Sequence, residues 1–214
     1  MFSKNTERVV LSEVTKYLKN ISPDSRYWKG KHSWAEMVYF RSAMSKRKSK
    51  FGFSKSDQIE VLRWGGINRF NQFELMKEGL TSLTKGEINQ EVFSRISSMS
   101  KLFSFYNPNL YFILDARVAL TINHLISLKN TKDKFIPFTP SKSRGEKVKK
   151  ALIQLTSNNN YNDIGIAYVA YNSLILSIFN QITIPNGLPQ KPEIIEMALF
   201  SMAEGIAEIY LNLK

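Results

Sequence analysis

The sequence predicts an all-α protein. Apolar residues recur at helical spacing in ten segments, and clusters of asparagine, proline and glycine separate these segments. The two strand-like stretches, 111–114 and 181–185, are each short enough to be extended connectors. A chain of 214 residues with 43% hydrophobic content can bury a substantial core. We therefore expect a single compact helical domain over residues 1–214, because no linker is long enough to separate independent domains.

The first five helices are expected in the N-terminal half, at residues 6–20, 33–48, 55–64, 68–79 and 87–96. Turn-forming residues mark their breaks, notably ISPDSRYWKGK at 21–31 and WGGIN at 64–68. Trp64 is expected in the core, and the two glycines after it end a helix.

The last five helices are expected at residues 99–106, 115–128, 144–158, 162–180 and 192–212. The most apolar stretch, 164–179, is shorter than a membrane span and contains Asn172, so it is expected to be a buried helix. His124 lies inside an apolar helix and is expected to be a core histidine.

Composition limits the chemistry. The chain has no cysteine and two histidines, which argues against disulfides, thiolate ligands and a transition-metal centre. The opening MFSKNTERVV lacks the apolar stretch of a secretory signal. We expect a cytoplasmic monomer that needs no metal or other cofactor and does not bind a membrane.

The net charge of +12 is unevenly distributed. Residues 26–69 contain eleven Lys/Arg and three Asp/Glu, residues 129–150 contain eight and two, and residues 151–214 contain two and five. Two concentrated basic segments indicate a basic face for a polyanion, with nucleic acid as the leading candidate. A solvated lysine-rich surface is the alternative.

Lys101 stands among apolar and aromatic residues in ISSMSKLFSFY. A break at Ser97–Ser98 predicts a short helical hairpin whose second helix begins near Ser98 or Ser100, where hydroxyls and free N–H groups suit a phosphate. A lysine in such a first turn, packed against Phe105, is expected to have a lowered pKa. A neutral lysine amine is a nucleophile toward a sugar carbon.

Asp115 follows an apolar stretch and precedes a helix, so it is a natural N-cap. A capping carboxylate stays ionised and can keep one oxygen free. Such a group can stabilise an oxocarbenium ion at a deoxyribose C1′.

The stretch SSMSKLFSFYNPNLYFILDARVA, with RWGGI at 63–67 and IEMALF at 195–200, resembles the bacterial 8-oxoguanine DNA glycosylase OGG-fold family. This family belongs to the helix-hairpin-helix DNA glycosylase superfamily. The resemblance implies a two-lobed helical bundle with its cleft near residues 96–125. It also implies that Lys101 attacks C1′ and forms a Schiff base, while Asp115 assists base departure.

The resemblance assigns further roles. Phe105 would contact the extruded base, and Glu196 and Phe200 would complete the base pocket. The hairpin departs from the family pattern, because SSMS has no glycine and the hydroxyls of Ser98 and Ser100 would have to hold the DNA phosphate. Further expected DNA contacts, each with a plain structural alternative, come from Arg117, Asn68, Arg69, Lys142 and Arg144.

The expected function is excision of a modified base from double-stranded DNA, with AP lyase activity as an open addition. An oxidised purine such as 8-oxoguanine follows from the resemblance, and a bulky modified phage base, which would imply anti-phage defence, fits the same residues. Two alternatives stay open: a non-catalytic helical DNA- or RNA-binding module, and an interaction protein whose basic face meets an acidic partner.

Overall fold

The computed structural model describes residues 1–22, 24, 26–27, 32–68, 74–86, 89–128, 133–137, 145–156 and 161–212. Its helices in the first half are α1 (Lys4–Leu18), α2 (Trp34–Phe51), α3 (Lys55–Trp64), α4 (Glu74–Lys85), α5 (Gln90–Phe93) and α6 (Ile96–Tyr106). Those in the second half are α7 (Ala116–Leu128), α8 (Glu146–Thr156), α9 (Ile164–Phe179) and α10 (Glu193–Asn212). The all-α prediction is confirmed.

Two short strands, β1 (Arg26–Tyr27) and β2 (His32–Ser33), form an antiparallel pair just before α2. The stretches 111–114 and 181–185 are extended or turn-like rather than paired in a sheet, as expected. The helix predicted at 68–79 corresponds to α4, which runs from Glu74 to Lys85, so the prediction ended six residues too early, and Asn68 lies outside a helix.

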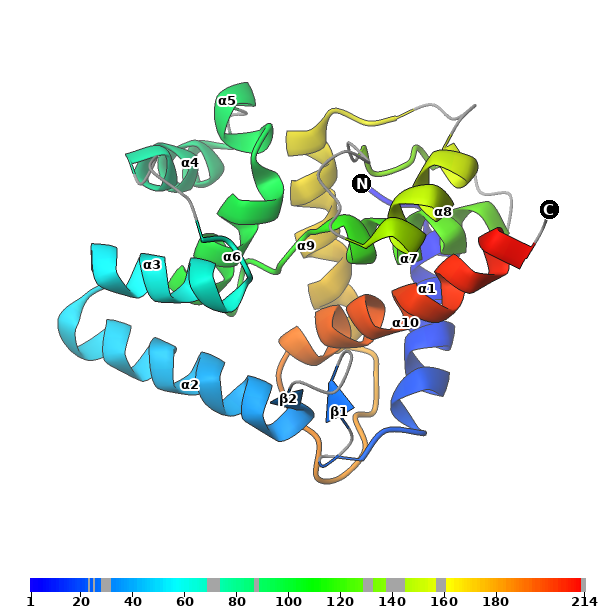
Figure 1. Cartoon of the computed structure of the whole chain (residues 1–214), viewed down its shortest axis with the longest axis horizontal. Helices are drawn as coiled ribbons and strands as arrows, with labels where there is room; N and C mark the ends of the chain where they lie inside the picture. Colours follow the sequence, from blue (N-terminus) through cyan, green and yellow to red (C-terminus); the bar gives the residue numbers. More distant parts are fainter. Residues whose placement is uncertain are drawn as a thin grey trace.

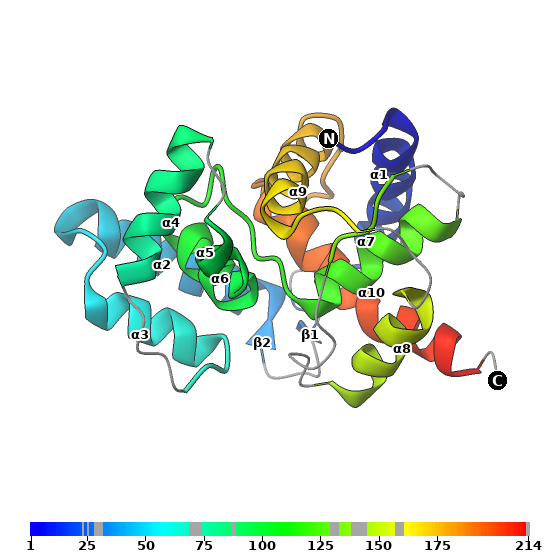
Figure 2. The same ribbon diagram turned by 90° about the horizontal axis from the view of Figure 1, so that it is seen from above.

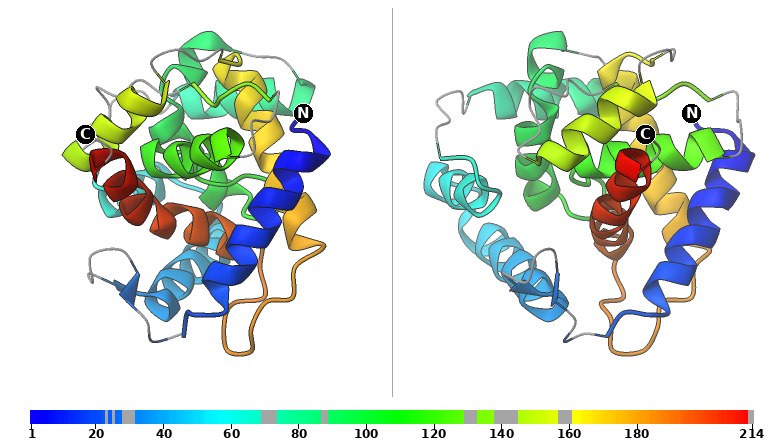
Figure 3. Two further views of the ribbon diagram at one scale, coloured as in Figure 1. Left: turned by 90° about the vertical axis from the view of Figure 1, so that its right-hand side faces the viewer. Right: turned by 45° about the vertical axis from the view of Figure 1, so that its right-hand side comes forward.

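The helices form two groups (Figures 1 and 2). In one group α6 contacts α2, α3, α4 and α5; in the other α10 contacts α1, α7, α8 and α9. Figure 3 shows α1 lying along α9, which also contacts α5 of the first group. Buried side chains of both groups belong to one continuous apolar cluster, including Leu62 and Phe103 in the first and Ile122 and Leu199 in the second.

Local capping explains where several helices begin. Ser33 with Glu36, and Ser54 with Asp57, form capping boxes at the start of α2 and α3. Asp163 accepts hydrogen bonds from the first N–H groups of α9. Such caps fix the residues at which these three helices begin.

Residues 107–115 carry the chain from α6 in the first group to α7 in the second (Figure 1). This connector is extended and turn-like, and Phe112 and Leu114 within it are fully buried. Lys101 lies on α6 before the connector, and Asp115 is the last residue of the connector. Within the described residues, no helix combines the length and the apolar character needed to cross a lipid bilayer.

Candidate functional site around Lys101 and Asp115

The helical hairpin is formed by α5 and α6, with Ser94 and Arg95 as the turn between them. The predicted break at Ser97–Ser98 lies three residues too late, because α6 begins at Ile96. The Arg95 carbonyl accepts hydrogen bonds from the N–H groups of Ser98 and Met99, at 2.9 and 3.0 Å, so no side-chain cap marks the start. Lys101 therefore lies in the second turn of α6 rather than in its first.

The Lys101 side chain is 7% exposed. Its Nζ donates a hydrogen bond to the Ser97 carbonyl oxygen one turn earlier, at 2.6 Å. The methylene groups pass over the backbone at Gly65, at the end of α3. The side chain is thus largely buried, and its amine is held close to the N-terminal turn of α6.

Asp115 is half-buried and caps α7. Its Oδ1 accepts hydrogen bonds from the N–H groups of Arg117 at 2.9 Å and of Val118 at 3.2 Å. Both bonds use the same carboxylate oxygen, which is the arrangement expected for an N-cap. The cap interpretation of Asp115 is therefore correct, and a chemical role has to be compatible with it.

Ser100 connects the two segments that carry Lys101 and Asp115. Its hydroxyl accepts a hydrogen bond from the Leu114 N–H at 3.0 Å and donates one to the Leu114 carbonyl at 3.3 Å. Ser100 directly precedes Lys101, and Leu114 directly precedes Asp115. This fully buried hydroxyl therefore holds α6 and the start of α7 in register, and that contact replaces the solvent-facing phosphate contact expected from the sequence.

Side chains from α9 satisfy the backbone of the connector ahead of Asp115. Asn172 accepts a hydrogen bond from the Phe112 N–H at 2.9 Å. The hydroxyls of Tyr168 and Tyr171 donate to the carbonyls of Phe112 and Ile113, at 3.2 and 2.9 Å. Burial raises the pKa of both tyrosines well above the ordinary value, so they remain donors. Buried backbone outside a helix needs such partners.

Glu196 on α10 completes this anchoring. Its carboxylate accepts two hydrogen bonds from Arg41 on α2, at 2.7 and 3.1 Å, and one from the Ile113 N–H at 2.9 Å. Burial raises the pKa of Glu196, although the positive charge of Arg41 acts in the opposite direction. The buried carboxylate therefore links both groups of helices to the connector, with the Ile113 contact two residues before Asp115.

Phe105 is 3% exposed and is covered by aromatic neighbours. The rings of Trp64 and Phe40 approach it edge-on, with centroid distances of 5.3 and 5.6 Å, and stack on each other at 5.3 Å. Both of these rings are half-buried. Of the three, Phe40 and Trp64 therefore retain more ring surface for an aromatic partner than Phe105 does.

Arg117 follows Asp115 by two positions and lies in the first turn of α7. It is 8% exposed, its guanidinium contacts Glu204 at 3.3 Å, and it lies 5.2 Å from the ring centroid of Phe200. Phe200 is half-buried on α10, one turn after Glu196. Phe200 thus contacts the guanidinium of Arg117, whereas Glu196 forms an ion pair with Arg41.

Of the remaining predicted DNA contacts, the structure describes Asn68 and Ser98. Asn68 is exposed just after α3, and Ser98 is half-buried in the first turn of α6. Arg69, Lys142 and Arg144 lie outside the described residues. Sequence reasoning missed Arg41 and Phe40. The position of Arg41, at helical spacing from the apolar residues Met37 and Met44, was the available signal.

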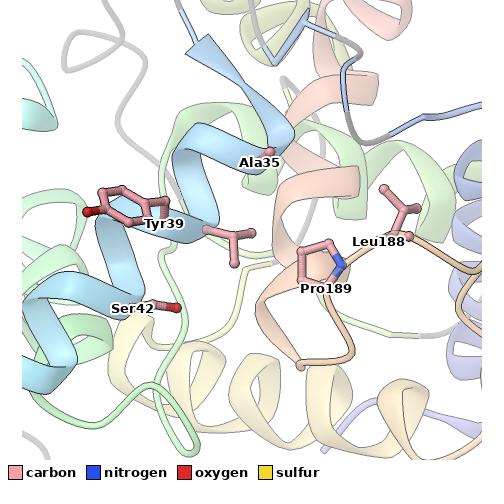
Figure 4. A pocket seen from close by; sticks show the side chains of 7 residues that line it. Ala35, Tyr39, Ser42, Leu188 and Pro189 are labelled. Atoms are coloured by element: carbon pink, nitrogen blue, oxygen red, sulfur yellow. The ribbon is translucent and has the colours of Figure 1, made fainter.

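A cavity of about 380 Å³ lies between α2 and the loop before α10 (Figure 4). Its lining is mainly apolar and consists of Ala35, Val38, Tyr39, Ser42, Gly187, Leu188 and Pro189. None of the residues predicted to act on DNA lines this cavity. Within the described part of the chain, no group of three or more His, Asp or Glu side chains is arranged to hold a metal ion.

Comparisons with protein-family models, with curated proteins and with solved structures gave no match to this chain. Residue chemistry and geometry are therefore the basis for assigning a function.

Proposed function

We propose that this chain is a helix-hairpin-helix DNA glycosylase that excises a modified base, with Lys101 as the amine nucleophile and Asp115 as the stabilising carboxylate. The observation that carries the proposal is the register between α6 and α7. Paired hydrogen bonds between Ser100 and Leu114 hold together the residues that directly precede Lys101 and Asp115. A nucleophile and a carboxylate on rigid, adjacent backbone suit a reaction at one sugar carbon.

In the proposed reaction, the lone pair of the Lys101 Nζ forms a bond to C1′ of the extruded nucleotide. The bond between C1′ and the base breaks, its electron pair leaves with the base nitrogen, and the base takes up a proton. Positive charge develops at C1′ and the ring oxygen, where the Asp115 carboxylate stabilises it. Nζ then loses a proton and the C1′–O4′ bond of the sugar ring breaks, with its oxygen taking up a proton, which gives a Schiff base on Lys101.

Strand scission is an additional proposed step. Loss of a proton from C2′ of the Schiff base expels the 3′ phosphate and cleaves the strand. Hydrolysis of the remaining imine returns the free lysine amine. The chain would thus be a bifunctional glycosylase and lyase that needs neither a metal nor an organic cofactor.

The charge distribution supports duplex DNA as the partner. The net charge is +12, and Lys46 and Arg47 are exposed on α2, where Arg47 also pairs with Asp57 and Glu60 of α3. Extruding a nucleotide costs a few kcal/mol, which contacts with the phosphate backbone offset. The partly exposed rings of Phe40 and Trp64, beside Phe105, offer an apolar surface on which an extruded base could stack.

The substrate class is tested with duplexes that carry 8-oxoguanine, uracil, hydroxymethylcytosine or glucosylated hydroxymethylcytosine. After incubation, alkali cleaves strands at sites that have lost their base. The proposal expects alkali-labile sites on at least one modified duplex and none on the unmodified control. The 8-oxoguanine duplex tests housekeeping repair, and the glucosylated duplex tests phage defence.

Binding without base removal on every duplex would overturn the proposed activity and favour a non-catalytic module. The affinity for DNA, measured at increasing salt, tests the remaining alternative, an interaction protein whose basic face meets an acidic partner. A protein that contacts several phosphates loses affinity steeply as salt rises, with a slope that scales with the number of contacts. Absence of measurable DNA affinity at low salt would instead favour an acidic protein partner.

A further inference from the structure

Two consecutive glycines, Gly65 and Gly66, end helix α3, and different structural features explain why each of these positions is a glycine. Gly66 has φ of 74°, a left-handed conformation that favours glycine. Gly65 has φ of −72°, which any residue adopts. Its N–H donates to the Val61 carbonyl at 2.9 Å, as in a regular helix end. The backbone therefore does not explain why residue 65 lacks a side chain.

Lys101 explains it. A Cβ atom added at Gly65 would lie 2.5 Å from Cδ and 2.8 Å from Cε of Lys101. Non-bonded carbon atoms normally stay about 3.5 Å apart or more. The lysine stem therefore occupies the space that a side chain at residue 65 would need.

The displaced atoms belong to a flexible side chain, which changes the expected consequence of a substitution. A methyl group at residue 65 can be accommodated by rotation of the lysine stem, with little effect on the packing of α3 against α6. The same rotation moves Nζ, which now donates to the Ser97 carbonyl at 2.6 Å. A small change at Gly65 should therefore act mainly on the position of the amine.

We propose that Gly65 is a positioning residue for Lys101: the bare backbone at the end of α3 sets the path of the lysine stem and so the place of its amine. The catalytic part of this inference rests on the proposed glycosylase function. The packing part stands on geometry and is tested without DNA.

Two other glycines provide matched controls. A Cβ at Gly79 on α4 would lie 2.6 Å from Cζ of Phe103 and 2.7 Å from Cγ1 of Val92, so Gly79→Ala disturbs the core of the same helix group but does not press directly on the lysine. A Cβ at Gly205 on α10 would meet no heavy atom within 4 Å apart from its chain neighbours and the nearby backbone of its own helix. Gly205→Ala should therefore leave both the fold and the lysine unchanged.

The packing part is tested by NMR on protein labelled with ¹³C at the lysine Cε position. The Lys101 signal is identified by its loss in the Lys101→Arg variant. Gly65→Ala is expected to shift this signal, whereas Gly205→Ala leaves it in place. Gly79→Ala is expected to lower the midpoint of thermal unfolding more than Gly65→Ala does. An unchanged Lys101 signal in Gly65→Ala would overturn the inference.

The catalytic part is tested by the rate at which borohydride traps a covalent adduct with an abasic-site duplex. Gly65→Ala is expected to slow trapping at least about tenfold, because small misplacements of reacting groups are costly. Its affinity for a duplex with a tetrahydrofuran abasic analogue should stay within about twofold, since that ligand reports binding without chemistry.

The outcomes separate the two proposals. A shifted lysine signal with slower trapping supports both. A shifted signal with trapping as fast as in the unsubstituted chain overturns the positioning role. If the unsubstituted chain forms no adduct with any duplex, a shifted signal still supports the packing of Lys101 against Gly65, while the proposed function fails.

Discussion

The Ser100 hydroxyl pairs with both polar backbone groups of Leu114, at 3.0 Å as acceptor and at 3.3 Å as donor. Fourteen positions separate the two residues. Each is the residue directly before a candidate functional side chain, so this contact sets the register of the whole site. An apolar side chain at residue 100 would leave a buried N–H and a buried carbonyl without this partner.

Ser100→Ala should therefore reduce the free energy of unfolding by about 1–3 kcal/mol, the usual cost of leaving buried polar groups unpaired. Chemical denaturation measures this change. Ser173→Ala is the control, because Ser173 is an exposed serine on α9 whose hydroxyl donates to the Val169 carbonyl of its own helix at 3.1 Å. The control should change stability by less than about 0.5 kcal/mol. Equal effects of the two substitutions would contradict the role given to Ser100.

The negative charge of Asp115 and its role as a helix cap can be tested separately. Asparagine caps helices about as well as aspartate, so Asp115→Asn should leave the free energy of unfolding within about 0.5 kcal/mol. The same substitution removes the charge and should lower the rate of base removal by about 10²-fold or more. Asp163→Asn, at the cap of α9, removes a capping charge elsewhere and should leave the rate unchanged.

Full activity in Asp115→Asn would show that Asp115 is only a cap. The opposite combination, a large loss of stability with an unchanged rate per folded molecule, would also remove it from the chemistry. Both quantities are measured on the same preparation, by denaturation and by single-turnover base release.

Because Arg41 and Glu196 form a buried ion pair, substitutions at the two residues should have non-additive effects on the free energy of unfolding. Glu196→Gln leaves the Arg41 charge without its ionic partner, which should cost about 3–5 kcal/mol of unfolding free energy. The double variant Arg41→Met with Glu196→Gln removes both charges, while the amide oxygen can still accept from the Ile113 N–H. The double variant should therefore be more stable than Glu196→Gln alone. The reverse order, measured by denaturation, would contradict the buried ion pair.

Glu7 predicts a specific acid dependence of stability. Hydrogen bonds from Ser177, Gln181 and Lys4 lower its pKa from 4.5 to about 2. A carboxyl with a lowered folded-state pKa stabilises the fold above its unfolded pKa, and this contribution is lost as the pH falls from about 4.5 toward 2. The stability difference between the unsubstituted chain and Glu7→Gln should therefore be constant above pH 5 and shrink toward zero near pH 2.

Glu13→Gln is the matched control for this pH dependence, because Glu13 is on the same helix and pairs with the exposed Lys16. Exposed ion pairs contribute little to stability, so this variant should differ little from the unsubstituted chain at any pH. A pH-independent effect of Glu7→Gln would contradict the lowered pKa.

Several parts of the structure could be predicted from local sequence. The spacing of apolar residues indicated each helix among the described residues, the position of Asp115 indicated a cap, and the pair Gly65 and Gly66 indicated the end of α3. Each of these signals lies within a few residues of the feature that it predicts. The start of α6 was predicted late, because the Arg95 carbonyl begins that helix and no side chain marks the position.

The contacts that organise the candidate site could not be predicted in this way. Arg41 and Glu196 lie 155 positions apart, and Tyr171 bonds to Ile113 across 58. Periodicity tells which face of a helix is buried, but it does not tell which helix lies opposite. The burial of Ser100 and the aromatic cover over Phe105 depend on that pairing, so they became visible only in three dimensions.

The central claim, that Lys101 is an amine nucleophile, is tested most directly by borohydride trapping on duplexes with 8-oxoguanine or an abasic site. The unsubstituted chain should form a covalent adduct with DNA that resists denaturation. Lys101→Ala should form none while still binding DNA, and Lys77→Ala, which removes an exposed lysine on α4, should form as much as the unsubstituted chain. An adduct of undiminished yield from Lys101→Ala, or none from the unsubstituted chain on any modified duplex, would contradict the claim.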